Sequence, residues 1–148
     1  MKTTHIAYKL FKLRKDGSLG PLFINAKLRV PTQEWMPAED HPTKGFAHRP
    51  GWHCCFYPVA PHLKTKVAGQ NRVWAKVEIE GIKTYDRPES QGGAWVLADR
   101  LKVLGVLDPI QVELLELDYH NRHKSTEERN HIRVQGFFKA IMATPTQA

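Results

Sequence analysis

Apolar and polar residues alternate most regularly along residues 72–81. Because successive side chains of a β-strand point to opposite faces, this period of two predicts a strand with one buried face. The side expected to be buried consists of Val73, Ala75, Val77 and Ile79. Residues 95–107 are rich in valine and leucine and predict a further strand, with a bend at Gly105.

The beginning of the chain predicts a β-hairpin. Apolar-rich runs at residues 6–13 and 22–30 flank a polar turn at residues 15–18. The turn contains Asp16 and Gly17, and both residue types tolerate the positive φ angles of tight hairpins.

The middle of the chain predicts little regular structure. Prolines at positions 31, 37, 42, 50, 58 and 61 remove backbone donors and restrict the residues that precede them. A long helix is therefore excluded here. We expect a short strand at residues 52–56 and a single helical turn at residues 60–66.

The last third of the chain predicts helices. Asp108 is a suitable helix cap, and Pro109 suits the first helical turn. The apolar residues that follow with helical spacing are Ile110, Leu114 and Leu117. Val112 also alternates with two of these residues, which leaves a strand as the alternative. We expect a loop or frayed helix end over residues 120–131 and a short apolar helix over residues 134–142.

Strands come first along the chain and helices last, an order typical of α+β proteins. We therefore predict an α+β fold with two small, mostly antiparallel sheets and short helices. Residues 1–107 form the predicted core domain. Residues 108–148 form a predicted helical extension packed on or beside that core.

Charge is unevenly distributed along the chain, and its distribution indicates the kind of partner. The chain has 148 residues and a formal net charge of +7. Residues 1–72 contain twelve Lys and Arg against four Asp and Glu, a net charge of +8, whereas residues 73–148 contain ten against eleven, a net charge of −1. A concentrated positive field attracts phosphates or acidic protein surfaces, so we expect an acidic partner: a nucleotide, a nucleic acid or a host protein.

Aromatic residues lie among the basic residues of the predicted hairpin. The cations are Lys9, Lys12, Arg14, Lys15, Lys27 and Arg29, and the rings between them are Tyr8, Phe11 and Phe23. Cations that follow phosphates, together with rings that stack on bases, are typical of single-strand binding. The alternative is that these rings form the core side of the hairpin.

Histidines and cysteines concentrate in one segment, which contains His41, His48, His53, Cys54, Cys55 and His62. Imidazole and thiolate groups bind zinc, but structural zinc sites use two pairs of ligands with short spacing. Here the two thiols are adjacent and would point to opposite faces of a strand, so we predict no metal site. Adjacent cysteines also exclude an ordinary disulfide scaffold.

No apolar run approaches the ~20 residues of a membrane helix, and we expect a cytoplasmic protein.

A series of short motifs resembles a family of small phage and prophage proteins. These motifs include Tyr8-Lys9-Leu10-Phe11, Arg49-Pro50-Gly51-Trp52-His53-Cys54 and Arg72-Val73-Trp74-Ala75. The resemblance extends from Tyr8 to about Leu104. It implies a phage accessory protein acting in the host cytoplasm, and it brings no activity with it.

A more distant resemblance is to the mono-ADP-ribosyltransferase fold, whose members bind NAD between two small sheets. It places Lys9 at the position of the first-strand Arg or His, and Trp52 and His53 in the middle segment. The late Glu of that family, which stabilises the oxocarbenium-like transition state, has no match here. The resemblance therefore implies NAD as the ligand and binding without turnover.

Together these observations favour a non-catalytic accessory protein that binds an acidic partner. The ligand-binding residues we predict are Lys9, Arg49, Trp52, His53 and His62. One alternative is an NAD-dependent ADP-ribosyltransferase or NAD glycohydrolase. The other is an inhibitor of a host defence enzyme, such as an anti-CRISPR protein.

Overall fold

The computed structural model describes residues 3–22, 27–39, 51–60, 63, 66–67, 70–86, 90 and 94–143. The chain divides into two compact units, Met1–Val106 and Leu107–Ala148. The first unit contains the strands and the second contains both helices.

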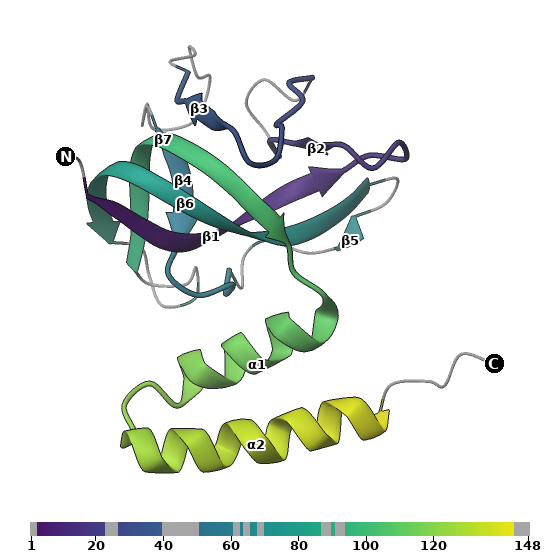
Figure 1. The fold of residues 1–148 in the computed structure, drawn as a ribbon, viewed down its shortest axis with the longest axis vertical. Coiled ribbons are helices and arrows are strands. Elements are labelled where there is room, and N and C mark those ends of the chain that lie inside the picture. The colour runs from purple at the N-terminus through teal and green to yellow at the C-terminus, as the bar shows by residue number, and fades with distance from the viewer. Residues whose placement is uncertain are drawn as a thin grey trace. The chain divides into compact units, whose positions relative to one another are not determined.

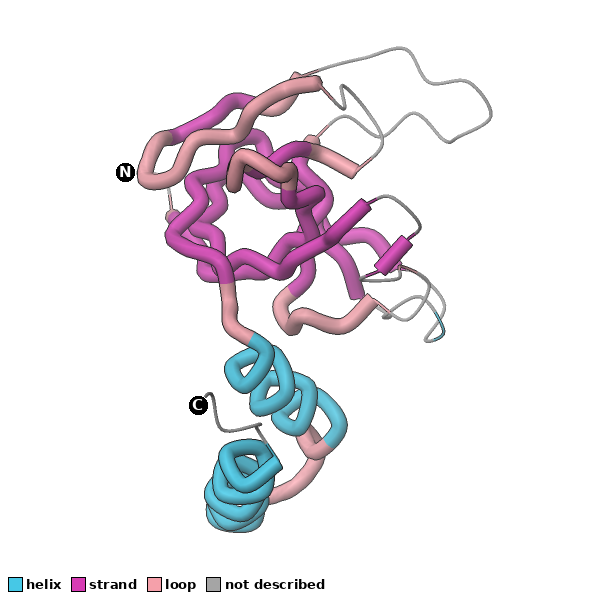
Figure 2. Tube along the Cα trace, turned by 90° about the vertical axis from the view of Figure 1, so that its right-hand side faces the viewer, coloured by secondary structure: helices cyan, strands magenta, loops and turns pink. Residues whose placement is uncertain are grey.

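The strands form one connected antiparallel sheet (Figure 1). They are β1 (Thr4–Leu13), β2 (Leu19–Gly20), β3 (Trp35–Pro37), β4 (Trp52–Cys55), β5 (Lys66–Val67), β6 (Gln70–Asp86) and β7 (Ala94–Val106). The strand order is β2-β1-β4-β7-β6-β5, and β3 pairs with β7. Because β1 also pairs with β6, the path β1-β4-β7-β6 returns to its start and closes into a ring (Figure 2). The α+β class is confirmed, but the two separate sheets that we predicted are replaced by one.

The length of β6 explains why a single sheet forms. One edge of β6 pairs with β1 from Thr4↔Glu80 to Leu13↔Asn71, while the other edge pairs with β7. A strand of this length can twist and coil far enough to bring its neighbours together. Gly81 in β6 has a φ of 69°, which only glycine adopts easily. The register of β6 on β7 shifts between Lys76 and Val77, which is a β-bulge or irregularity.

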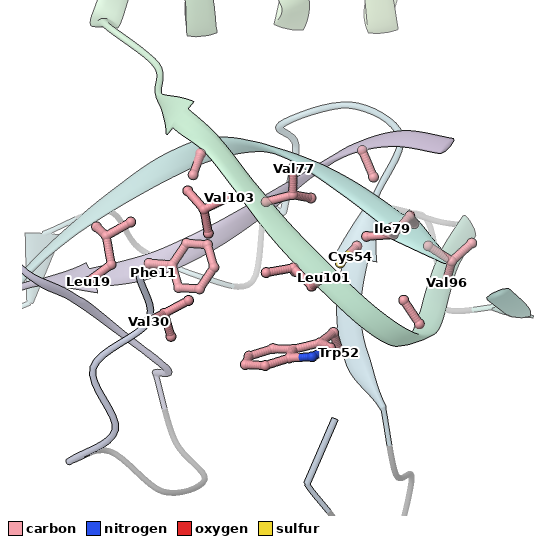
Figure 3. Packing of buried hydrophobic residues seen from close by; sticks show 13 residues of the cluster. Phe11, Leu19, Val30, Trp52, Cys54, Val77, Ile79, Val96, Leu101 and Val103 are labelled. Carbon is pink, nitrogen blue, oxygen red and sulfur yellow. The ribbon is translucent and has the colours of Figure 1, made fainter. Parts of the chain in front are cut away.

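The core fills the interior of the ring (Figure 3). It includes the predicted face of β6, since Ala75, Val77 and Ile79 are all fully buried. Other strands contribute Ala7, Phe11, Leu19, Trp52, Cys54, Val96, Ala98, Leu101 and Val103. The alternation that predicted β6 therefore identified the inward face correctly.

The first arm and the turn of the predicted hairpin are confirmed, but its second arm is β2 and not residues 22–30. Asp16 accepts hydrogen bonds from the backbone N–H and the hydroxyl of Ser18, and Gly17 has a φ of 86°. The second arm begins at Leu19, earlier than the sequence indicated. It ends after two residues because Pro21, which follows, has no N–H to donate to a ladder.

The helices are α1 (Pro109–His120) and α2 (Thr126–Ala143). Asp108 and Gln111 form a reciprocal capping box at the start of α1, which confirms the helix and excludes the strand alternative. The loop or frayed end expected over residues 120–131 is wrong in its second half, because α2 begins at Thr126. The Ser125 hydroxyl accepts from the N–H of Glu128 and supplies the helix start that we overlooked.

The helices pair closely within their unit. An added Cβ at Gly136 would collide with the side chain of Leu117, so the absence of a side chain allows α2 to approach α1. Arg133 forms an ion pair with Asp118 across the two helices, at 2.8 Å. Among the described residues, no helix is long and apolar enough to span a membrane.

Candidate functional site

Three of the five predicted ligand-binding residues lie together. The Nζ atom of Lys9 donates a hydrogen bond to the carbonyl oxygen of His53 at 2.9 Å. The same nitrogen lies 5.8 Å from the ring centroid of Trp52. Arg49 and His62 lie outside the described residues, so the structure gives no placement for them.

Trp52 is a core residue, not a ring exposed to a ligand. It is only 7% exposed, and its indole nitrogen donates to the carbonyl oxygen of Met36 at 3.1 Å. Figure 3 shows its ring among the other interior side chains. His53, between the inward-facing Trp52 and Cys54, is half-buried and points to the other side of β4.

Lys9 also faces the interior, between Ala7 and Phe11 on β1. Burial lowers the pKa of its amine, and the nearby Cys54 and Cys55 partly oppose that shift. Within the described residues, β1 and β4 share the single register pair Tyr8↔Cys55. The hydrogen bond from Lys9 to β4 therefore adds a second link at the place where the ring closes, which is a structural role.

The two cysteines are poor nucleophiles. Cys54 is fully buried and Cys55 is 4% exposed, and both are free thiols. Burial raises the pKa of the Cys54 thiol to about 11, although Lys9 acts in the opposite direction. Because the thiolate is the reactive form, Cys54 is inert at neutral pH.

The shifted pKa of Cys54 predicts a loss of stability in alkali. Its thiol stays neutral in the folded protein up to about pH 11, whereas in the unfolded chain it ionises near its ordinary pKa of 9.0. The stabilisation is therefore complete below pH 9 and declines as the pH rises through 11. Between pH 8 and 11, wild type should lose about 2 kcal/mol more unfolding free energy than Cys54→Ala, as measured by urea denaturation. If the unfolding free energies of the two proteins changed in parallel with pH, the raised pKa of the Cys54 thiol would be contradicted.

The outer side of the β1–β6 pair presents a different kind of surface. Because Ala7 and Phe11 face the interior, Tyr8 and Lys12 face outward. The register places Tyr8 opposite Lys76 and Lys12 opposite Arg72. Directly opposite residues on neighbouring strands share a face, so a tyrosine and three cations lie on one side of this strand pair.

Two further cations lie near the hairpin end of β1. Lys15 is exposed in the turn, and Arg29 bonds to both Asp16 and the Ser18 hydroxyl. Hydrogen bonds from Ser18, and then from Arg29, hold the pKa of Asp16 well below its usual range. We call this surface the basic face, and it consists of Tyr8, Lys12, Lys15, Arg29, Arg72 and Lys76.

The neighbouring surface on β6, β7 and β3 is neutralised instead. Lys102 pairs with Glu78 at 3.1 Å, and Arg100 pairs with Glu80 at 3.4 Å. Both cations also lie over the ring of Trp35, each at 5.0 Å from its centroid. Carboxylates of β6 therefore balance the two cations of this surface.

Charge separates between the two units as well. Residues 1–106 contain seventeen Lys and Arg against nine Asp and Glu, a net charge of +8. Residues 107–148 contain five against six, a net charge of −1. The positive field of this protein therefore belongs to the sheet unit.

Sequence reasoning overlooked Arg72, Lys76 and Phe56 as candidate contacts. Phe56 is 40% exposed and directly follows Cys55, which is in register with Tyr8. The alternation of β6 already put Lys76 on the solvent side. The missing information was that β1 pairs with β6, which brings the tyrosine of one strand to the lysine of the other.

Among the described residues, no group of three His, Cys, Asp or Glu side chains could hold a metal ion. Comparisons with protein-family models, curated proteins and solved structures give no match. The interpretation of the basic face therefore depends on its own chemistry.

Proposed function

We propose that this protein binds single-stranded nucleic acid through the basic face, as a non-catalytic accessory protein of the phage type. The observation that carries the proposal is the register of β1 on β6, which sets Tyr8 beside Lys76 and Lys12 beside Arg72. Cations that neutralise phosphates and a ring that can stack on a base are the two components of sequence-tolerant single-strand binding.

The aromatic side chains favour nucleic acid over an acidic protein. An acidic surface offers carboxylates to the cations but few planar groups to stack on Tyr8. A base offers a planar face to this ring, while its phosphate reaches the lysine or arginine beside it. A single strand therefore uses both the cations and the aromatic ring of the basic face.

An NAD-cleaving activity has less support from the site. Trp52, which the distant family resemblance places beside the nicotinamide, is buried in the core. Lys9, placed at the nucleotide-binding position, already donates to the His53 carbonyl. We therefore make binding, and not turnover, the proposed function.

The test is a fluorescence anisotropy titration of the full chain with a labelled oligonucleotide of about 20 thymidines, in 50 mM salt. Unlabelled duplex DNA and polyglutamate of matched charge serve as competitors. We expect the single strand to bind, duplex to compete weakly and polyglutamate to compete more weakly still. No binding at this salt concentration would overturn the proposal, and so would polyglutamate that competes as well as the unlabelled single strand.

A further inference from the structure

The helical unit exposes a stripe of apolar side chains along α2. Val134, Phe138 and Ile141 are 55%, 62% and 43% exposed. Their spacing of four and then three residues places them on one side of the helix. Phe137 and Met142 flank the stripe and are 42% and 84% exposed.

The stripe points away from α1. Gly136 marks the side of α2 that approaches Leu117 of α1, and Ala140, one turn later on this side, is buried. Each residue advances about 100° around a helix, so Val134 and Phe138 each lie about 200° from Gly136. The partner helix of the hairpin therefore cannot cover them.

The helical unit buries little by itself. None of the residues of α1 is buried, and Ala140 is the buried residue of α2. A fully buried aromatic side chain contributes roughly 150–250 Å² of surface, so the five exposed residues offer a few hundred Å². Two such stripes joined together would bury roughly 1,000 Å², which is close to the lower limit for a specific interface.

We propose that the stripe binds the same stripe of a second copy of this chain, with the two α2 helices antiparallel about a twofold axis near Phe138. A twofold interface is self-complementary, so one apolar stripe supplies both sides. Antiparallel packing also points the two helix dipoles in opposite directions, which is favourable.

Charge supports this choice of partner. The stripe contains no charged residue, and residues 107–148 carry a net charge of only −1, so two helical units meet little repulsion. Two sheet units, each at +8, repel one another. A dimer joined through the helices carries one basic face in each copy. The dimer itself does not depend on the proposed function.

The test is the molar mass of the full chain, without nucleic acid, by size-exclusion chromatography with light scattering at 1 to 100 µM. We expect twice the 17.0 kDa of one chain at the upper concentrations. Phe138→Glu and Ile141→Glu should each weaken dimerisation at least 100-fold, with helix content by circular dichroism unchanged. Lys139→Gln changes the net charge by the same amount as each glutamate substitution, but on a neighbouring side of α2. This variant should remain dimeric.

Two results would overturn the proposal. One is a wild-type protein that remains monomeric at 100 µM. The other is a dimer that persists in both glutamate variants, which would place the contact elsewhere. In a monomeric protein, a Phe138→Cys variant that resists thiol reagents would show that the stripe is covered within its own chain.

Discussion

Replacing Lys15 and Lys76 together by glutamate is expected to weaken binding of a single-stranded oligonucleotide at least 25-fold in 0.1 M salt. Both residues are exposed on the basic face. Each phosphate contact on a single strand contributes about 0.7 to the slope of log K against log salt. Losing one contact therefore lowers the affinity about 5-fold at this salt concentration. Two lost contacts give about 25-fold, and the repulsion from the new carboxylates adds to it. The same anisotropy titration measures the change.

The matched control is Lys83→Glu with Lys124→Glu. Lys83 is exposed on β6 beyond the part that pairs with β1, and Lys124 lies in the turn between the helices. Both double variants lower the formal net charge from +7 to +3, so the overall field falls equally. We expect the control to lose no more than about 3-fold. Equal losses in the two variants would mean that total charge, and not the basic face, controls binding.

Gly81→Ala is expected to destabilise the sheet unit by about 2 to 4 kcal/mol. A φ of 69° at this position costs a residue with a side chain about 1 to 2 kcal/mol. The added Cβ would also lie 2.9 Å from the Cβ and Cγ atoms of Asp99 and closer to its carboxylate, so this side chain must move. Urea denaturation followed by tryptophan fluorescence measures the loss.

Gly105→Ala is the control for this substitution. Gly105 lies on β7, opposite Lys76, and an added Cβ there meets no atom within 4 Å. We expect the unfolding free energy of this variant to stay within about 0.5 kcal/mol of wild type. If both variants lost the same stability, the positive φ of Gly81 and its close approach to Asp99 would not be the cause of the loss.

Local signals in the sequence predicted local structure well. The alternation of β6 identified its buried face, and Asp108 with Pro109 identified the start of α1. These signals reside in neighbouring residues, so they can be read without knowing the fold. The start of α2 was overlooked because its first turns are polar, and a polar helix is specified by its cap and its packing more than by an apolar pattern.

Closure of the sheet could not be predicted in this way. It depends on the pairing of β1 with β6, which are far apart in the sequence. The residues of β1 are apolar on both faces, so no alternation shows which side turns inward. Leu10 and Trp74 are an example, since both are buried although they lie on the outer side of the ring.

The same dependence on long-range pairing explains why the sequence alone could not place the residues of the candidate site. The segment around Trp52 and His53 attracted attention because reactive side chains cluster there. Whether Trp52 or His53 faces inward depends on the pairing of β4 with β7, where Trp52 lies opposite the buried Ala98. Lys9 was expected to face a ligand because the distant family resemblance placed it there, and an inward-facing lysine has no sequence signature.

The most direct test of the account is the salt dependence of single-strand binding by the full chain between 0.05 and 0.2 M. The basic-face lysine and arginine side chains of β1, β6 and the turn after β1 are counted as phosphate contacts: Lys12, Lys15, Arg72 and Lys76. Four contacts predict a slope of log K against log salt of about −3, a loss of about 50-fold over this range. A slope shallower than about −1, or one that the Lys15→Glu and Lys76→Glu double variant leaves unchanged, would contradict the account.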